Sequence, residues 1–324
     1  MMINNPLKLY NYEEPRLKFN YSQKVTDPRD GIMLFGPFDK GKINNISVGI
    51  IGTQFGIENM KNWLNKIHRP IYDYPPDLAK PFYPGFEEAF GVSVNFNSIK
   101  EIEIDENTLN NYYKYSDGHV RVSHMVDLYI DSIVKFIHEN ESPIDLWFIV
   151  VPDNVYKYGR INSTIPVEGK IDIGIGNEYM RYNEGWFEDE DFKKMRNSYY
   201  YENNFHNQLK LKLLRYKIIS QIIRESTIAF EKILKQNNKP LRDLTKFQTA
   251  IAWNLSTSMY YKVGGLPWKL ADIRPDVCYI GLVFKKDLTH KDEKTACCAA
   301  QMFLDSGDGL VFRGDVGPWY NPDT

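Results

Sequence analysis

Four polar side chains have the types and the spacing that a phosphate-binding site requires. His206 and Lys210 lie four residues apart in the stretch FHNQLKLKLLR, and Gln221 and Lys246 follow further along the chain. If His206 opens a helix, Lys210 lies one turn further along the same face, near the positive end of the helix dipole. An imidazole, an ammonium group and a helix start together favour an anion. These residues therefore predict a pocket built from segments that are distant in sequence.

Other interpretations of the same residues are open. A chain with 40 Lys plus Arg and 6 His contains His-x-x-x-Lys pairs on solvated helix faces by chance. An enzyme for a phosphorylated small molecule, on a Rossmann-like sheet, would use His206 as general base and Lys210 or Lys246 to bind the phosphate. Such an enzyme would need a nucleotide-binding loop. The loop GTQFG at 52–56 matches neither G-x-G-x-x-G nor G-x-x-x-x-G-K-[ST]. A scaffold for a partner protein would need none of the four residues.

The order His206, Lys210, Gln221, Lys246 resembles the guide 5′-phosphate pocket in the MID domain of Argonaute proteins. Longer strings are similar to short prokaryotic Argonautes, especially those paired with a TIR-APAZ protein. These strings are SQIIREST, YYKVGGLPWKLADIRPDVCYIGLVFK and ACCAAQMFLDSGDGLVFRGDVGPWYNP. The resemblance extends from EEPRLKF and DPRDGIMLFGPFD, at residues 13–39, to Pro322.

The resemblance implies a set of ligands and partners. The four pocket residues would bind the 5′ phosphate of a guide RNA, with Mg²⁺ beside it, and the guide would pair with single-stranded target DNA. A TIR-APAZ protein would form a heterodimer with this chain, or a higher oligomer after target binding, and would degrade NAD as a defence against plasmids or phage. The expected location is the cytoplasm.

The resemblance also bears on catalysis. Slicing Argonautes have a ribonuclease H-like PIWI domain that gathers carboxylates around two metal ions. The first carboxylate belongs in the strand CYIGLVFKK, two residues past its glycine, and Val283 occupies that position. Asp305 and Asp308 lie nearby in FLDSGDG, a spacing that suits a tight turn. We therefore expect no catalytic residues, no metal site and no cleavage by this chain.

Composition is typical of a folded protein of about two domains, with 324 residues, 43% hydrophobic and 14% aromatic. The net charge of −2 means that a nucleic acid must meet a local basic groove. The sequence contains no apolar run of about 18 residues, so no membrane span is predicted. The positions of Cys278, Cys297 and Cys298 give no zinc spacing and fit a reducing cytoplasm.

The hydrophobic pattern predicts an α/β fold. ISVGIIGT, at 46–53, indicates a buried strand, and a helical period follows to Ile67. A second helical period covers Val122–His138, before the apolar strand IDLWFIVVPD at 144–153, and a third covers Phe247–Lys262. Helices alternating with apolar strands indicate a parallel sheet. We expect a Rossmann-like MID domain followed by the N-terminal part of a ribonuclease H-like PIWI domain.

The expected boundaries are an extended segment at 1–40, a MID domain at 41–250 with an insertion near 155–204, and part of a PIWI domain at 251–324. The resemblance implies that a complete PIWI domain continues beyond Thr324. In the first segment, proline and glycine argue against a helix, and Asp27, Arg29 and Asp30 suit a turn.

Five aromatic residues between 70 and 86 could stack on bases, although packing is their commoner use. They are Tyr72, Tyr74, Phe82, Tyr83 and Phe86.

Overall fold

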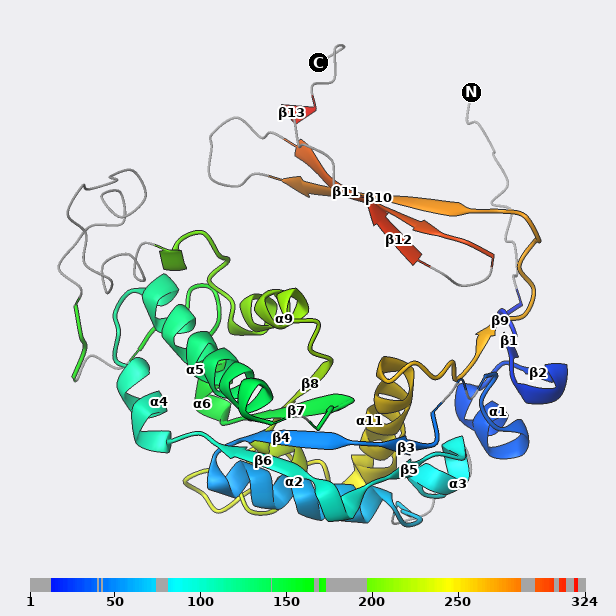
Figure 1. Cartoon of the computed structure of the whole chain (residues 1–324), viewed down its shortest axis with the longest axis horizontal. Coiled ribbons are helices and arrows are strands. Elements are labelled where there is room, and N and C mark those ends of the chain that lie inside the picture. The colour runs from blue at the N-terminus through cyan, green and yellow to red at the C-terminus, as the bar shows by residue number, and fades with distance from the viewer. Residues whose placement is uncertain are drawn as a thin grey trace, which may run out of the picture. The chain divides into compact units, whose positions relative to one another are not determined.

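A computed structural model describes most of the chain (Figure 1). The described residues are 13–39, 41, 43–73, 81–140, 142–165, 169–172, 197–286, 295–305, 309–312 and 318–319. Contacts divide the chain into two compact units, one formed by 40–267 and the other by 1–39 together with 268–324. No helix in the described ranges combines the length and the apolar character that crossing a membrane requires.

The unit 40–267 is built on a four-stranded parallel sheet with the order β6-β4-β7-β8. The strands are β4 (Val48–Gly52), β6 (Lys100–Glu103), β7 (Leu146–Val151) and β8 (Ser220–Arg224). Every residue of β4 and β7 is buried, as expected for central parallel strands that are covered on both faces. The predicted α/β class with a parallel sheet is confirmed.

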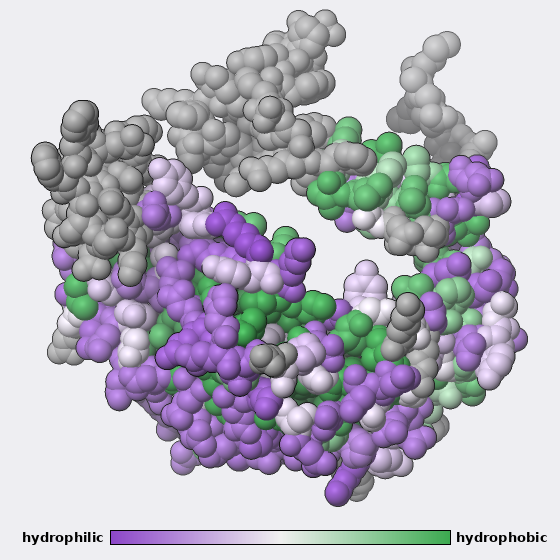
Figure 2. All heavy atoms as spheres, viewed as in Figure 1, coloured by the Kyte–Doolittle hydropathy of each residue, from purple (hydrophilic) through white to green (hydrophobic). Residues whose placement is uncertain are grey.

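Helices cover both faces of this sheet (Figure 1). One face carries α5 (Gly118–Glu139) and α9 (Phe205–Arg215), whose apolar residues join Trp147, Ile149 and Val151 of β7 in one core. The other face carries α2 (Gln54–Ile67). Hydrophilic residues spread over most of the visible outer surface of this unit, as Figure 2 shows.

The helix starts explain where these elements begin. Thr53 caps α2 by accepting a 3.0 Å hydrogen bond from the Gly56 amide, and Asp117 caps α5 through the Val120 amide. Within α2 the buried residues Ile57, Met60, Leu64 and Ile67 recur at helical spacing. The predicted strand-helix pairs at 46–67 and 122–153 are therefore confirmed.

Shorter elements complete this unit. They are β3 (Asn45–Ile46), parallel to β5 (Ser93–Val94), and α3 (Phe86–Phe90), η2 (Phe96–Ser98), α4 (Glu106–Tyr112), α6 (Asp153–Tyr158), α10 (Glu225–Ile228), η3 (Thr245–Phe247) and α11 (Gln248–Lys262). Much of the predicted insertion near 155–204 lies outside the described residues.

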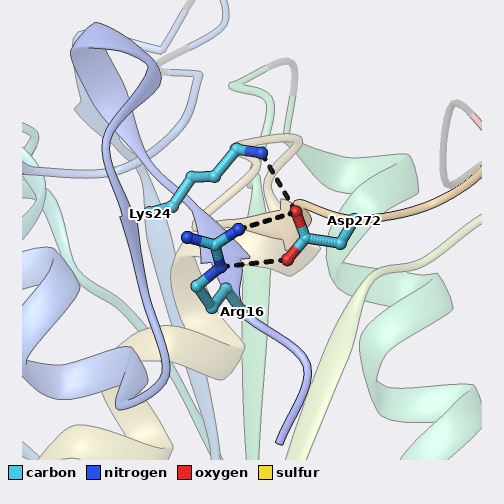
Figure 3. A network of polar contacts seen from close by, with 3 residues as sticks. All are labelled: Arg16, Lys24 and Asp272. Atoms are coloured by element: carbon cyan, nitrogen blue, oxygen red, sulfur yellow. Dashed lines mark hydrogen bonds and ion pairs between the residues drawn. The ribbon is translucent and has the colours of Figure 1, made fainter. Parts of the chain in front are cut away.

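The second unit joins the two ends of the described chain. β1 (Leu17–Lys18) pairs antiparallel with both β2 (Lys24–Val25) and β9 (Lys269–Leu270). Asp272 accepts hydrogen bonds from Arg16 and Lys24 and holds the ends of these strands together (Figure 3). A second sheet contains β10 (Tyr279–Lys286), β11 (Thr295–Phe303), β12 (Gly309–Phe312) and β13 (Pro318–Trp319).

One sequence prediction needs correction here. Residues Pro28–Phe35 form helix α1, next to the 3-10 turn η1 (Asn20–Ser22), although proline and glycine argued against a helix. Pro28 lies in the first turn, where a missing amide costs nothing, and Asp27 accepts from the amides of Arg29 (2.7 Å) and Asp30 (3.2 Å). Asp27 is therefore a helix cap rather than part of an open turn.

The division by contacts differs from the expected domain boundaries. The contact division falls at 267, not at 250, because α11 belongs with the parallel sheet. The segment before 40 does not stand apart but pairs with β9.

Candidate anion-binding site

Strand β8 lies at the edge of the parallel sheet, and two lysines from different helices meet at its first residue. Lys210 of α9 donates from Nζ to the Ser220 carbonyl oxygen (2.5 Å) and to Ser220 Oγ (2.9 Å). Lys262, the last residue of α11, donates from Nζ to the same carbonyl oxygen (2.8 Å). In the described part of the chain β8 pairs only with β7, so the two lysines meet at an edge strand.

Gln221 is held beside this pair. Its Oε1 accepts from Lys262 Nζ (2.5 Å) and from Ser258 Oγ (3.2 Å). Ser258 and Lys262 are one turn apart on α11 and so face the same way. The carboxamide of Gln221 is thereby fixed next to two ammonium groups.

The electrostatics of the pair favour an anion. Both lysines are half-buried, and burial lowers the pKa of Lys210. Burial and the neighbouring charge of Lys210 lower the pKa of Lys262 to about 8. Among the described residues, neither lysine forms an ion pair with a carboxylate. Two like charges without a counterion are costly inside a protein, and a bound anion would stabilise both.

His206 lies at the start of α9, as predicted. Asn204 caps this helix by accepting from the Asn207 amide (3.1 Å), and the exposed His206 side chain follows in the first turn. His206 and Gln221 line one open cavity of about 650 Å³. The backbone amides of the first turn of α9 add the positive end of the helix dipole to its wall.

The same cavity is lined by three arginines, Arg160, Arg224 and Arg242, and none of its described lining residues is acidic. The guanidinium carbons of Arg160 and Arg224 lie 3.5 Å and 4.1 Å from the centre of the Tyr156 ring. Arg242 donates to Thr227 Oγ1 (2.6 Å). Arg224 also lies 4.0 Å from a carboxylate oxygen of Asp153, so the three guanidinium groups leave the cavity with a positive charge that Asp153 reduces.

A buried arginine shapes one wall of this cavity. Arg121 is 2% exposed and donates to the carbonyl oxygens of Tyr115 (2.6 Å), Tyr158 (3.0 Å) and Ser163 (3.2 Å). These bonds tie the segment that carries Arg160 to the start of α5. Burial lowers the pKa of Arg121, but the carbonyl oxygens compensate for the lost hydration of its charge.

The structure brings together only part of the predicted site. Lys210 and Gln221 are connected through Lys262, which donates to Gln221 Oε1 and to the Ser220 carbonyl oxygen that also accepts from Lys210. His206 lines the same cavity as Gln221. Lys246 is exposed in η3, at the opposite end of α11 from Lys262. At 1.5 Å per residue the length of α11 separates the two lysines by about 21 Å. Lys246 therefore does not join the other three residues.

Lys262 takes the place that Lys246 was expected to fill. Its signal in the sequence is YYKVGG, where a lysine ends a helix directly before the glycines that stop it. Ser258, four residues earlier, is a second polar residue on the same face of a largely apolar helix. This i, i+4 pair forms a polar stripe on α11 and is the sequence signal that points to Lys262.

The described residues offer little catalytic chemistry. Val283 lies in β10, as predicted. Asp305 accepts from the Asp276 amide (3.0 Å) and has a turn role, whereas Asp308 lies outside the described residues. No group of three or more His, Cys, Asp or Glu in the described ranges could hold a metal. His206 Nδ1 lies 3.4 Å from Asn207 Oδ1, and a contact with this neighbouring side chain does not orient the imidazole as a general base.

Three of the 96 solved chains that are similar to this chain illustrate the match. They are Clostridium butyricum Argonaute bound to a guide DNA and a 19-mer target DNA (16% identity, TM-score 0.47), Aa-Ago with externally bound siRNA (13%, 0.42) and Drosophila Piwi (12%, 0.39). These are Argonaute and Piwi proteins. The matches cover 95%, 93% and 95% of this chain but 31%, 31% and 30% of those chains. No protein-family model and no curated protein matches the sequence.

Proposed function

We propose that this chain binds the 5′-phosphorylated end of a single-stranded guide nucleic acid. The observation that carries the proposal is the meeting of Lys210 and Lys262 at the Ser220 carbonyl, with Gln221 fixed beside them and no carboxylate partner in the described part of the chain. A terminal phosphate supplies the missing negative charge and accepts several hydrogen bonds at once. His206 and the start of α9 complete the pocket.

The basic cavity beside this pair supports a nucleic acid rather than a free phosphate ion. Arg160, Arg224 and Arg242 add three cations to a cavity of about 650 Å³, more space than one phosphate fills. An aromatic ring, Tyr156, lies between two of them. Cations combined with an aromatic surface suit the backbone and bases of a strand.

The finer function rests on the resemblance of the longer sequence strings to short prokaryotic Argonautes. It adds that the guide is RNA, that the target is single-stranded DNA, and that the chain does not cleave the target. It also adds a TIR-APAZ partner that degrades NAD in defence against plasmids or phage, and a cytoplasmic location.

The Mg²⁺ that the resemblance implies does not fit the described residues. Around Lys210 and Lys262 the chain places ammonium groups, one carboxamide and one hydroxyl, and no carboxylate of the described part reaches them. Mg²⁺ prefers oxygen ligands with carboxylates or phosphates among them. In this proposal the two lysines neutralise the phosphate, and any Mg²⁺ would take its ligands from the guide phosphate.

The alternative is an enzyme for a phosphorylated small molecule with His206 as general base. It would use the same cations, but it lacks an orienting partner for His206 among the described residues.

One binding experiment separates these functions. The affinities of a 5′-phosphorylated and a 5′-hydroxyl oligoribonucleotide of one sequence are measured with the purified chain, alone and with its TIR-APAZ partner. Each charge-assisted bond contributes about 1.5–3 kcal/mol, so we expect at least a tenfold preference for the phosphate. Equal affinities for the two oligonucleotides would refute the proposal.

A further inference from the structure

A second basic surface lies on the unit 40–267, at the C-terminal end of α2. It is an open cleft of about 820 Å³ whose lining includes Lys66, His68, Arg69, Tyr72 and Gln248. No acidic residue is among its described lining residues. Lys66 and Arg69 are exposed, and Lys66 donates to the carboxamide of Gln248 at the start of α11. The cleft therefore presents cations to the solvent.

Two aromatic rings stand beside these cations. The rings of Tyr72 and Phe82 stack, with centroids 5.0 Å apart and planes 19° apart. Tyr72 is 68% exposed and Phe82 38%, so the stack continues into solvent on the Tyr72 side. Tyr72 therefore offers an open aromatic face next to the cations of the cleft.

The backbone fixes this aromatic pair in place. Ile71 and Tyr83 form an antiparallel bridge with amide-to-carbonyl distances of 2.8 Å and 3.0 Å. Both residues point inward, and the buried Tyr83 hydroxyl lies 2.6 Å from Ser256 Oγ of α11. Because side chains alternate along extended backbone, Tyr72 and Phe82 point outward from the same bridge. The pair is preorganised and not a chance contact of mobile rings.

We propose that the cleft binds a single-stranded segment of nucleic acid, with a base stacked on Tyr72 and backbone phosphates at Lys66 and Arg69. Every base has a π-face, so stacking on an exposed ring tolerates any sequence, and adjacent cations follow the backbone. A protein partner is less well matched, because interface cores are depleted of lysine.

This site is separate from the phosphate pocket. Gln248 and Lys262 are the first and last residues of α11, so the two sites lie about 21 Å apart along the helix. Lys246, which does not reach the phosphate pocket, directly precedes this end of the helix and is exposed. The inference therefore does not require the proposed 5′-phosphate function.

The test uses a 5′-hydroxyl oligouridylate and a 5′-hydroxyl oligothymidylate, which lack the group that the phosphate pocket would bind. Binding is measured by fluorescence anisotropy with the full chain and with Tyr72→Ala, Tyr72→Phe and the double variant Lys66→Gln/Arg69→Gln. Tyr200→Ala removes an equally exposed ring elsewhere (73% exposed), and Lys135→Gln removes an exposed cation of α5.

We expect Tyr72→Ala to weaken binding at least fivefold, because one base–aromatic stack is worth about 1–3 kcal/mol. Tyr72→Phe should keep the affinity. The double variant should lower the salt slope by about 1.4, since each lost phosphate contact contributes about 0.7. Tyr200→Ala should have no effect, and Lys135→Gln should leave the salt slope unchanged.

A photocrosslink gives an independent readout. An oligonucleotide with 5-iodouridine should crosslink to Tyr72 or Phe82, as mass spectrometry of the peptides would show. Unchanged affinity of Tyr72→Ala together with crosslinks confined to other residues would overturn the inference. The inference would also be overturned if Tyr72→Ala lost a co-purifying protein while its affinity for the oligonucleotide stayed unchanged. That result would assign the cleft to a protein partner.

These outcomes are distinguishable from failure of the 5′-phosphate proposal. Tyr72→Ala should leave the ratio of affinities for 5′-phosphorylated and 5′-hydroxyl strands unchanged, whereas Lys262→Glu should abolish that ratio and leave the crosslink at Tyr72 intact.

Discussion

The hydroxyl of Thr53 donates a 2.5 Å hydrogen bond to Oε1 of Glu225, and both side chains are buried. The same hydroxyl oxygen caps α2, so this one bond joins the helix after β4 to the helix after β8. Burial raises the pKa of the Glu225 carboxyl, and the nearby charge of Asp153 raises this pKa further, against the opposite effect of the Thr53 bond. A carboxyl group that resists ionisation therefore lies beside the cavity.

Stability should respond to this carboxyl group. Because the pKa of Glu225 is higher in the folded state than in the unfolded state, its contribution to the free energy of unfolding is greatest below the ordinary carboxyl pKa and falls as pH rises through the folded pKa. Glu225→Gln keeps the hydrogen bond from Thr53 but has no proton to lose. Urea unfolding between pH 4 and 8 should show the variant gaining stability relative to the natural protein as pH rises. A constant difference would contradict this.

The lysines at the two ends of α11, Lys246 in the preceding η3 and Lys262 at its last residue, should differ in their effect on guide binding. Lys262→Ala removes one charge-assisted bond and should weaken binding of a 5′-phosphorylated oligonucleotide between about tenfold and a hundredfold. Lys246→Ala, at the other end of the helix, should change the affinity of a short strand less than twofold. The comparison needs strands too short to reach the end of α11, and equal losses for the two variants would contradict the site.

Binding of the phosphate should depend on pH through Lys262. Its pKa of about 8 means that the free protein loses this charge as pH rises from 7 to 9, whereas a bound phosphate requires it. The phosphate itself is already a dianion above pH 7. Affinity should therefore fall with rising pH, approaching tenfold per unit above pH 8. Lys262→Arg, which keeps its charge, should remove this fall if the site accepts the larger head group. A pH-independent affinity of the natural chain would argue against a titrating Lys262.

Cleavage of the target should be absent. The chain with guide, complementary target and Mg²⁺ or Mn²⁺ should leave the target intact for hours, because Val283 cannot bind a metal. Denaturing electrophoresis with an inactivated slicer as contamination control provides the measurement. Guide-dependent cutting at one position would show the prediction to be wrong.

Anchoring of the guide and association with the partner should be separable. The variant Lys210→Glu/Lys262→Glu puts two negative charges at the Ser220 carbonyl and should abolish guide loading. A stable heterodimer is held by a much larger surface, so the proposed TIR-APAZ partner should still co-purify, but without target-triggered loss of NAD. Size-exclusion chromatography and a fluorescent NAD assay decide this. Dissociation of the pair would mean that the lysines are structural, and full triggered activity would mean that the guide is bound elsewhere.

The strands and helices of the parallel-sheet unit could be predicted from the sequence because apolar residues recur at a regular spacing within each element. Burial of β7 on both faces produces the apolar run LWFIVV, and α2 places apolar residues every three or four positions. Helix α1 was missed because Asp-Pro begins turns and helices alike, and only the cap geometry of Asp27 separates the two. Of the five aromatic residues at 72–86, Tyr83 and Phe86 are buried, whereas Tyr72 and Phe82 are not, and Tyr74 lies outside the described residues.

The candidate site was only partly predictable because it is closed by tertiary contacts. His206 and Lys210 lie on one helix, so their proximity follows from the spacing alone. The choice between Lys246 and Lys262 depends on which end of α11 contacts β8. A single sequence does not show which end that is. The arginines of the cavity come from three separate segments, and no local spacing connects them.

The pairing of β1 with β9 has a consequence for how the chain is made. Leu17 pairs with Leu270, a partner that the ribosome adds about 250 residues later. At about 5–20 residues per second, the N-terminal strand waits between roughly 12 and 50 s for this partner. The parallel sheet at 48–224 can form during that interval. Synthesis thus sets an order in which the sheet of the phosphate site forms first and the unit that joins both ends of the described chain closes last.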